Sequence, residues 1–169
     1  MSARAGDSSP AVDPGEPRVE GLGFAVAVPA GWDLRIYRRS PEDGGQTYPI
    51  LHAATFPLPP NRGDFGGGAV ERMRPGDLFA ALLDYGPAHS GNALFSAARP
   101  PWPLRAGDFR PSVLHRALGG QVGTQRFFTI AGRKLCLYAV IAGIRPGVTT
   151  VERLNELLGR LTIGPWVPP

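Results

Sequence analysis

The sequence is poor in the residues that build covalent and metal-bound sites. It contains one cysteine, Cys136, and three histidines, none of them in a zinc-binding spacing. A single cysteine excludes an intramolecular disulfide. No apolar run approaches the roughly 20 residues that cross a bilayer, and residues 1–20 lack the apolar segment of a signal peptide. We therefore expect a cytoplasmic protein that uses neither a metal nor another cofactor.

The chain also lacks any dense block of one charge. The formal net charge is +4, and all but one of the 18 basic residues are arginine. The densest group is Arg35, Arg38 and Arg39, whereas a nucleic-acid surface needs many clustered cations. Arginine, alanine, glycine and proline share GC-rich codons, which is sufficient to explain the arginines. We expect a protein or small-molecule partner, and neither a nucleic acid nor a membrane.

Glycine and proline are abundant, at 23 and 19 residues, but they are clustered rather than spread. The clusters indicate long ordered loops. Residues 1–20 are rich in charge and proline and have no apolar periodicity, which predicts a disordered N-terminal tail. Residues 21–169 are numerous enough for one domain with its own core.

Apolar residues alternate from Leu22 to Val28, which predicts a strand with one buried face. Further strands are predicted over WDLRIYRR (32–39) and YPILHAATF (48–56). The stretch DLFAALLDY (77–85) is short and bounded by Pro-Gly and Gly-Pro, so a buried strand is favoured over a helix there. A short helix over AVERM (69–73) is expected to precede it.

The segment TTVERLNELLGRLTI (149–163) predicts an amphipathic helix followed by a short strand. Thr149 and Glu152 have the spacing of a capping box, and Gly159 is placed to end the helix. The apolar stripe consists of Val151, Leu154, Leu157 and Leu158. The predicted fold is α+β, with a largely antiparallel sheet of about six or seven strands and this C-terminal helix packed on it.

Two stretches, GFAVAVPAGW (23–32) and VERLNELLGRLTIG (151–164), resemble the two ends of PsbP-like α/β/α sandwich domains. The resemblance covers about 24 residues. It implies a largely antiparallel sheet with helices on both faces, in a superfamily whose known members mostly bind or stabilise partners. It carries over no functional residue, since no site motif matches.

Cys136 lies in the second arm of a predicted hairpin, QVGTQRFFTIAGRKLCLYAVIA (121–142). Gly132 and Arg133 suit a type II′ turn, which places Cys136 beside Phe127 and Tyr138 on the less apolar side of the ribbon. A three-residue loop is the alternative. Burial without a close cation raises the pKa of a thiol, so the sequence favours a core residue over a reactive nucleophile.

The region GPAHSGNALFSAARPPWPLRAGDF (86–109) is a long connection with little predicted regular structure, and such connections are usually functional or disordered. We predict that Arg99, Trp102 and Arg105 bind a ligand or partner there, with Pro100 to Arg105 in a PxxPxR spacing. The alternative is that Trp102 packs the loop onto the sheet.

The leading hypothesis is a non-enzymatic binding domain that uses the loop 86–109, with the loop 57–68 beside it. One alternative is a small hydrolase or thiol enzyme in which Cys136, His89 or His115 and an aspartate meet only in the fold; the aspartates considered are Asp77, Asp84 and Asp108. Another is a structural subunit of an assembly. The triplet 62–64 (Arg-Gly-Asp) matches an adhesion tripeptide, but three letters are weak evidence in a chain this rich in arginine and glycine. The glycine loop GDFGGG (63–68) lacks both the Walker ending and the dinucleotide-binding spacing, which favours a flexible connection.

Overall fold

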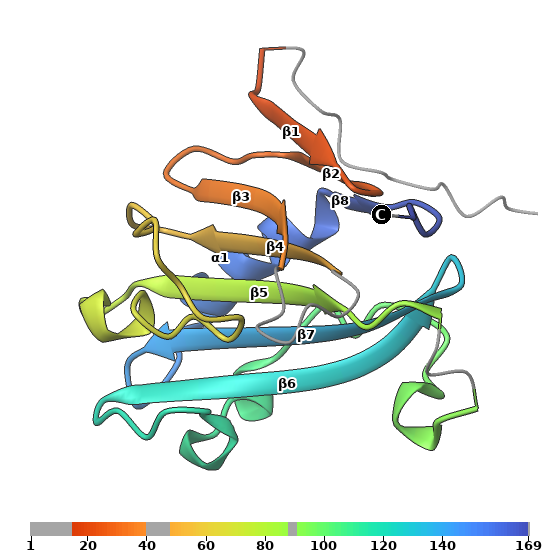
Figure 1. The fold of residues 1–169 in the computed structure, drawn as a ribbon. Helices are drawn as coiled ribbons and strands as arrows, with labels where there is room; N and C mark the ends of the chain where they lie inside the picture. Colours follow the sequence, from red (N-terminus) through yellow and green to blue (C-terminus); the bar gives the residue numbers. More distant parts are fainter. Residues whose placement is uncertain (1–14, 40–47, 88–90, 169) are drawn as a thin grey trace, which may run out of the picture.

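The computed structural model describes residues 15–39, 48–87 and 91–168. Its strands pair antiparallel in two sheets, of three strands (order β1-β2-β8) and five strands (order β3-β4-β5-β7-β6) (Figure 1). The strands are β1 Arg18–Gly21, β2 Phe24–Ala27, β3 Asp33–Arg38, β4 Pro49–Ala54, β5 Leu78–Asp84, β6 Gln121–Ile130, β7 Arg133–Ala142 and β8 Leu161–Ile163. A helix, α1 (Val148–Gly159), lies behind the larger sheet in this view. The α+β class is confirmed, but the predicted sheet of six or seven strands is wrong.

The small sheet accounts for this difference. β2 pairs with β8, Phe24 opposite Ile163, and not with β3, which follows it in the chain. β1 adds a third strand and contains residues 18–20, which fall inside the predicted tail. In β1, Val19 packs on the core while Arg18 and Glu20 are exposed and form an ion pair. The charges that suggested a tail therefore lie on the solvent side of an edge strand.

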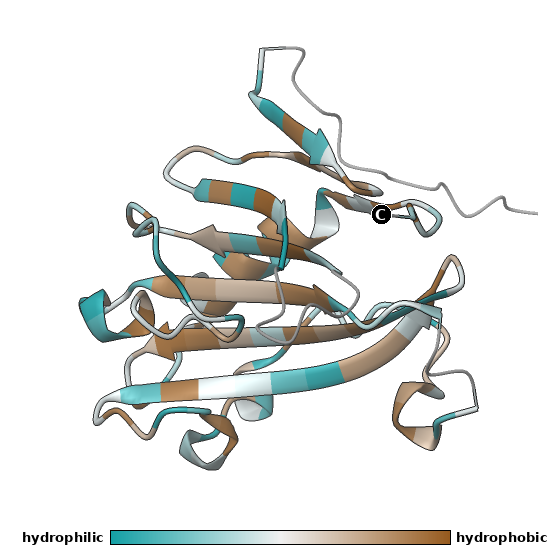
Figure 2. Cartoon of the chain, in the orientation of Figure 1, coloured by the Kyte–Doolittle hydropathy of each residue, from teal (hydrophilic) through white to brown (hydrophobic). Residues whose placement is uncertain are grey.

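The larger sheet buries both of its faces. Figure 2 shows β5 and β7 as predominantly hydrophobic strands, whereas the middle of β6 is hydrophilic. The first face carries Leu82, Leu137 and Phe128, and it is covered by α1, by β2 and by the segment around Leu104. All seven residues of β5 are buried, as expected for a strand that lies between two others. The predicted strand over 77–85 is confirmed.

The second face is covered by irregular chain rather than by an α-helix of the described part. It carries Ile50, Phe79 and Tyr138, on which Leu58 and Val70 from the connection between β4 and β5 pack. This connection contains a short 3-10 helix, η1 (Val70–Arg72), within the stretch where a short helix was predicted. Between β5 and β6 the described residues include the 3-10 turns η3 Ala93–Phe95, η4 Ala106–Asp108 and η5 Pro111–Val113.

Helix α1 buries the predicted apolar stripe, Val151, Leu154, Leu157 and Leu158, and ends at Gly159. The predicted capping box is wrong. The N-cap is Gly147, and the helix has no side-chain cap hydrogen bond, because the extended backbone at Gly147 starts the helix two residues earlier than expected. Thr149 therefore lies within the first turn and not at the cap.

The turn between β6 and β7 also differs from the prediction. Its two residues are Ala131 and Gly132, with φ of 51° and 74°, as a type I′ turn requires. Arg133 begins β7 opposite Ile130. The predicted type II′ turn over Gly132 and Arg133 is wrong, and Phe127 rather than Thr129 lies opposite Cys136. Each residue of β7 lies opposite a β6 residue two positions before the predicted one. A shift of two residues leaves every side chain on its predicted face.

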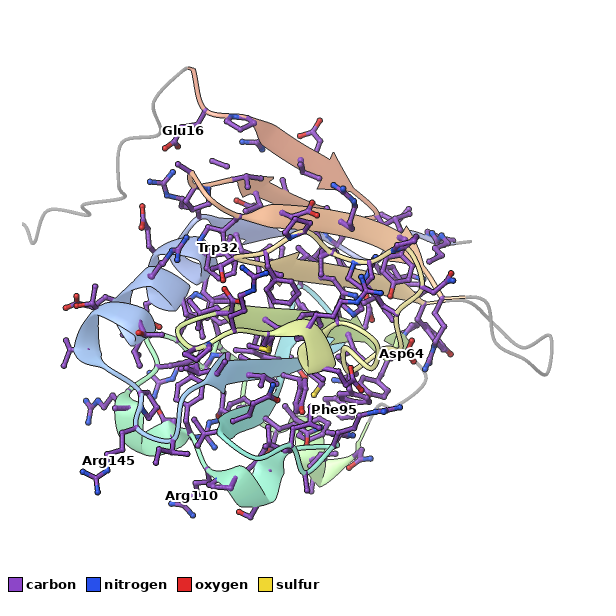
Figure 3. The ribbon with its side chains drawn as sticks, turned by 90° about the vertical axis from the view of Figure 1, so that its left-hand side faces the viewer. Glu16, Trp32, Asp64, Phe95, Arg110 and Arg145 are labelled. Atoms are coloured by element: carbon purple, nitrogen blue, oxygen red, sulfur yellow. The ribbon has the colours of Figure 1, made fainter. Side chains whose placement is uncertain are left out.

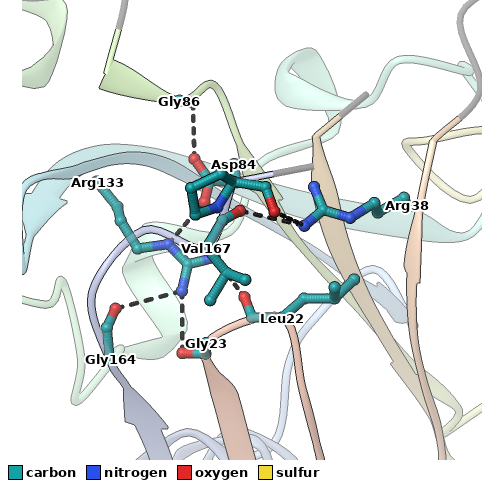
Figure 4. A network of polar contacts seen from close by, with 9 residues as sticks. Leu22, Gly23, Arg38, Asp84, Gly86, Arg133, Gly164 and Val167 are labelled. Atoms are coloured by element: carbon teal, nitrogen blue, oxygen red, sulfur yellow. Dashed lines mark hydrogen bonds and ion pairs between the residues drawn. The ribbon is translucent and has the colours of Figure 1, made fainter. Parts of the chain in front are cut away.

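The position of Arg133 at the start of β7 places its side chain in the interior, where it pairs with Asp84. It is fully buried, and its Nε donates to the Asp84 carboxylate at 2.6 Å (Figure 4). The guanidinium also donates to the carbonyl oxygens of Leu22, Gly23 and Gly164, at 3.1, 2.9 and 3.3 Å. Arg133 thus joins the larger sheet to both the β1–β2 turn and the chain after β8.

The surroundings of this guanidinium are adapted to it. It lies 4.1 Å from the ring centroid of Phe24, a favourable cation–π arrangement. Gly23 has a φ of 80°, and a Cβ there would approach Arg133 Nη1 to 2.4 Å, so this position requires glycine. Asp84 accepts a second hydrogen bond from the Gly86 N–H. A buried charge needs such complete partnering, which the pair has.

Candidate functional site

Cys136 lies in a closed environment. Its side chain is fully buried in the centre of the second face, and the Gln125 amide donates to its sulfur at 3.5 Å. Burial raises the pKa of the thiol to about 11, and the Gln125 hydrogen bond acts in the opposite direction. No imidazole or cation contacts the sulfur among the described residues. The geometry therefore gives no activation to this cysteine.

The element that covers the Cys136 face is an aromatic cluster. Phe65, from the connection after β4, stacks on His115 at a centroid distance of 3.8 Å and meets Tyr138 edge-on at 5.3 Å. The Tyr138 hydroxyl accepts a hydrogen bond from the His115 N–H, and Tyr138 is only 2% exposed. Tyr138 is thus packed with these groups, whereas Phe127 on the same face packs with Tyr85 and Phe95.

A second polar cluster surrounds the buried His52. Its Nε2 donates to the Asp64 carbonyl at 2.9 Å, and its Nδ1 accepts from Arg62 Nε at 3.0 Å. Burial lowers the pKa of His52 to about 4, so the ring is neutral at physiological pH. The Asp64 carboxylate pairs with Arg39. Arg62 and Asp64, the ends of the Arg-Gly-Asp triplet, are therefore engaged in holding their own loop on the sheet.

The remaining residues of the predicted enzyme alternative have local roles where the structure describes them. His115 is exposed and stacks on Phe65, and His89 lies outside the described residues. Asp77 caps a turn by accepting from the Arg74 N–H, Asp84 pairs with Arg133, and Asp108 pairs with Arg126. No group of histidine, cysteine and acidic side chains able to hold a metal occurs in the described ranges.

The predicted binding residues of the loop 86–109 do not share one environment. Trp102 is half-buried and packs edge-on against Phe128 at 5.7 Å, while Arg99 and Arg105 are exposed. Asn155 of α1 holds the backbone of Leu104 in place. Its side-chain amide accepts a hydrogen bond from the Leu104 N–H at 2.7 Å and donates one to the Leu104 carbonyl at 2.9 Å. The proline-rich stretch is therefore anchored to the core through Trp102 and Leu104.

This anchoring leaves part of the β6 edge open. Next to the loop, the backbone of Gly123 exchanges two hydrogen bonds with Arg110, and the Thr129 N–H donates to the Ala97 carbonyl. Between these points the chain leaves the edge to cross the first face. Residues two apart in a strand point their backbone groups the same way, so those of Gln125 and Phe127 point outward, and none has a partner in the described part of the chain.

A cleft of about 160 Å³ lies at this open edge. It is lined by Gly107, Asp108, Arg110, Val113, Thr124, Gln125 and Arg126. Arg126 pairs with Asp108 at 2.7 Å, and Arg110 is exposed and points away from the ribbon at the margin of the molecule (Figure 3). Thr124 is fully buried, and its hydroxyl has no hydrogen-bond partner within the described residues. The cleft thus combines cationic groups with an unused buried hydroxyl.

Two other surface hollows offer less chemistry. One, of about 400 Å³, lies between Met73 and Ile144 and is lined by no charged side chain of the described part. The other, of about 290 Å³, surrounds Trp32, whose buried indole nitrogen lacks a described partner. Its one carboxylate, Asp33, already pairs with Arg35 and accepts from the Leu58 N–H.

Sequence reasoning missed the residues of the β6 cleft except Asp108, which it considered only for the enzyme alternative. Thr124, Gln125 and Arg126 form three consecutive polar positions inside an otherwise apolar hairpin. This interruption signals an edge strand, because a central strand of a sheet that is covered on both faces reads as continuously apolar. Arg110 carried no such signal, because its place beside Gly123 depends on a long-range pairing.

Comparisons with known proteins give no relative: no family model, curated protein or solved structure matches the chain. Within the described residues, no helix is both long and apolar enough to span a bilayer. The β6 edge and its cleft are therefore interpreted from their own geometry.

Proposed function

We propose that this protein is a binding domain that takes up an extended segment of a partner protein along the open edge of β6. The observation that carries the proposal is the set of outward N–H and carbonyl groups of Gln125 and Phe127, which have no partner in the described chain. An extended peptide would satisfy these groups as an additional strand, which is a common mode of peptide recognition.

The way the protein treats the rest of this edge supports the proposal. Its own chain pairs with Gly123 and Thr129, on either side of the open stretch. Proteins usually cover or interrupt the edges of their sheets, since an unpaired edge invites association. Here the covering chain departs from the edge between Ala97 and Arg110 and is held away from it by Trp102 and Leu104.

The two sides of the open stretch differ in character. Gln125 and Phe127 point to the second face, where Phe127 contacts Phe95 edge-on at 5.5 Å. Thr124 and Arg126 point to the opposite side, toward the cleft. An added strand would therefore place alternate side chains in an aromatic and in a polar setting, which provides specificity beyond the backbone.

The sequence-based hypotheses enter the proposal as follows. The loop 86–109 acts by framing the edge, and Arg99 and Arg105 contribute charge around it. The resemblance of 23–32 and 151–164 to PsbP-like domains is in keeping with a partner-binding role. A cytoplasmic location and a protein rather than a nucleic-acid partner remain predictions.

The test is selection of short random peptides on the immobilised protein, followed by binding measurements on two variants. Gln125→Pro removes one outward N–H that the β6–β7 ladder does not use, and proline is compatible with such edge positions. Gln125→Ala is the matched control, since it removes the same side chain but keeps the N–H. We expect selected peptides to bind Gln125→Pro about tenfold more weakly than Gln125→Ala, because a backbone hydrogen bond is lost.

Equal binding of the selected peptides to both variants would contradict the proposal. Native mass spectrometry of the unliganded protein tests the assembly alternative in parallel. A discrete oligomer that persists in Gln125→Ala and dissociates in Gln125→Pro would assign the edge to a second copy of the chain instead.

A further inference from the structure

We infer that the bound segment is acidic, and that the carboxylate of one of its aspartate or glutamate residues occupies the cleft between Arg110, Thr124 and Arg126. This inference rests on the proposed function, because it names the class of peptide that the β6 edge would take. Two independent features of the cleft carry it: an excess of positive charge and an unused hydroxyl donor.

The charge around the edge is strongly one-sided. The segments 97–110 and 123–129 contain four arginines, Arg99, Arg105, Arg110 and Arg126, and a single acidic residue, Asp108. Asp108 is already engaged, since one oxygen pairs with Arg126 and the other accepts from the Arg105 N–H. Arg110 has no ionic partner among the described residues, although it lines the cleft. The site therefore has guanidinium groups in excess over carboxylates.

Thr124 provides the second feature. A buried hydroxyl in a folded protein almost always has a hydrogen-bond partner, and each exception requires an explanation. The Thr124 side chain is 0% exposed and lines the cleft, yet its Oγ1 has no partner in the described chain. A carboxylate in the cleft would accept this hydrogen bond while facing the guanidinium groups, which explains both features with one ligand group.

Strand geometry brings such a carboxylate to the right side. Thr124 and Arg126 lie on the same face of β6, about 7 Å apart along the strand. In an added strand, the residue opposite Arg126 points to that same face, with its Cβ roughly 5 Å away. The position opposite Thr124 is taken by Phe109, which precedes the Arg110 that pairs with Gly123. An aspartate or glutamate at this register therefore reaches the cleft, whereas one residue earlier or later it would point to the aromatic side.

The experiment compares the tightest selected peptide with the same peptide in which each acidic residue is replaced by its amide. Binding is measured by calorimetry on the wild type and on Arg110→Gln, Thr124→Val and Arg35→Gln. Arg35 is an exposed arginine of β3, at the opposite edge of the same sheet, so it controls for the loss of net charge. We expect the amide peptide to bind the wild type about tenfold more weakly, and this preference to shrink in Arg110→Gln and Thr124→Val but not in Arg35→Gln.

Thr124→Val separates a binding role from a structural one. Because the hydroxyl is unpaired in the free protein, its removal should leave thermal stability unchanged or raise it, while acidic-peptide binding weakens. A loss of stability in Thr124→Val without loss of the acidic preference would overturn the assignment of Thr124.

The remaining outcomes are distinct. If no peptide is selected, the proposed function and this inference both fail. If peptides are selected but their amide forms bind equally well, the inference fails and the proposed function stands. Competition by a single-stranded oligothymidylate as effective as the acidic peptide would overturn the inference in favour of a general polyanion surface. Displacement of the peptide by acetate alone at matched concentration would reduce the site to a small-anion pocket and also overturn it.

Discussion

His52 is expected to make the protein progressively less stable as the pH falls from about 6.5 to about 4. Burial lowers the pKa of this histidine from 6.5 to about 4, although the Asp64 carbonyl that accepts from Nε2 acts in the opposite direction. The Arg62 guanidinium next to Nδ1 adds to the lowering. In the folded protein the imidazole therefore stays neutral at mildly acidic pH.

The sign and size of the effect follow from proton binding. Between pH 6.5 and about 4 the unfolded chain has protonated His52 and the folded protein has not, so acidification favours unfolding. The contribution is fully present above pH 6.5 and is lost through this window. At about 1.4 kcal/mol for each pH unit, the total loss is roughly 3 kcal/mol. That is a large part of the stability of an ordinary domain.

The assay is denaturant unfolding, followed by tryptophan fluorescence at about pH 7.5 and about pH 4.5, of the wild type and His52→Gln. Glutamine can still donate to Asp64 and accept from Arg62, but it does not titrate. We expect the variant to be less stable at neutral pH because it fits the site less well, and to lose about 2 to 3 kcal/mol less than the wild type on acidification.

His115→Gln is the matched control, because His115 is exposed. It should follow the pH dependence of the wild type. The reasoning would be refuted if the difference in unfolding free energy between the wild type and His52→Gln were the same at both pH values. Titration of the His52 ring by NMR near its ordinary pKa, in the folded protein, would refute it equally.

Three further predictions concern the core. Asp84→Asn should cost about 3–5 kcal/mol in unfolding free energy, because it leaves the Arg133 charge buried without its partner, and a double variant with leucine at 84 and methionine at 133 should lose less. Cys136 should react with a thiol reagent at about pH 7.5 only as fast as the protein unfolds, because burial raises its pKa to about 11; rapid labelling of the folded protein would contradict this. Asn155→Ala should lower the unfolding free energy by about 1–3 kcal/mol, since it frees two backbone groups of Leu104, and an unchanged melting temperature would show that the clamp is dispensable.

Local pattern predicted most of the elements. Alternation located the strands that became β3 and β4, and the bounding Pro-Gly and Gly-Pro pairs favoured the strand at 77–85. The stripe from Val151 to Leu158 placed the buried face of α1 correctly. These features depend on residues a few positions apart, so one sequence contains the necessary information.

The features that the sequence did not reveal depend on distant partners. The division into two sheets follows from pairing Phe24 with Ile163. The hairpin turn moved because Asp84 draws Arg133 into the strand, which outweighs the preference of a glycine for the first loop position. The candidate site is defined by the outward backbone groups of Gln125 and Phe127, which have no partner in the described chain. A missing backbone partner leaves no pattern in the sequence.

The long reach of Arg133 has a consequence for how the chain is made. Its guanidinium bonds to carbonyls on both sides of the sequence, at residues 22–23 and at Gly164, and β2 cannot complete its sheet without β8. During synthesis from the N-terminus, the first strands emerge long before the last one. We therefore expect the β1–β2 hairpin to wait at the ribosome without its β8 partner, so that the final native contacts form only after residue 164 has left the exit tunnel.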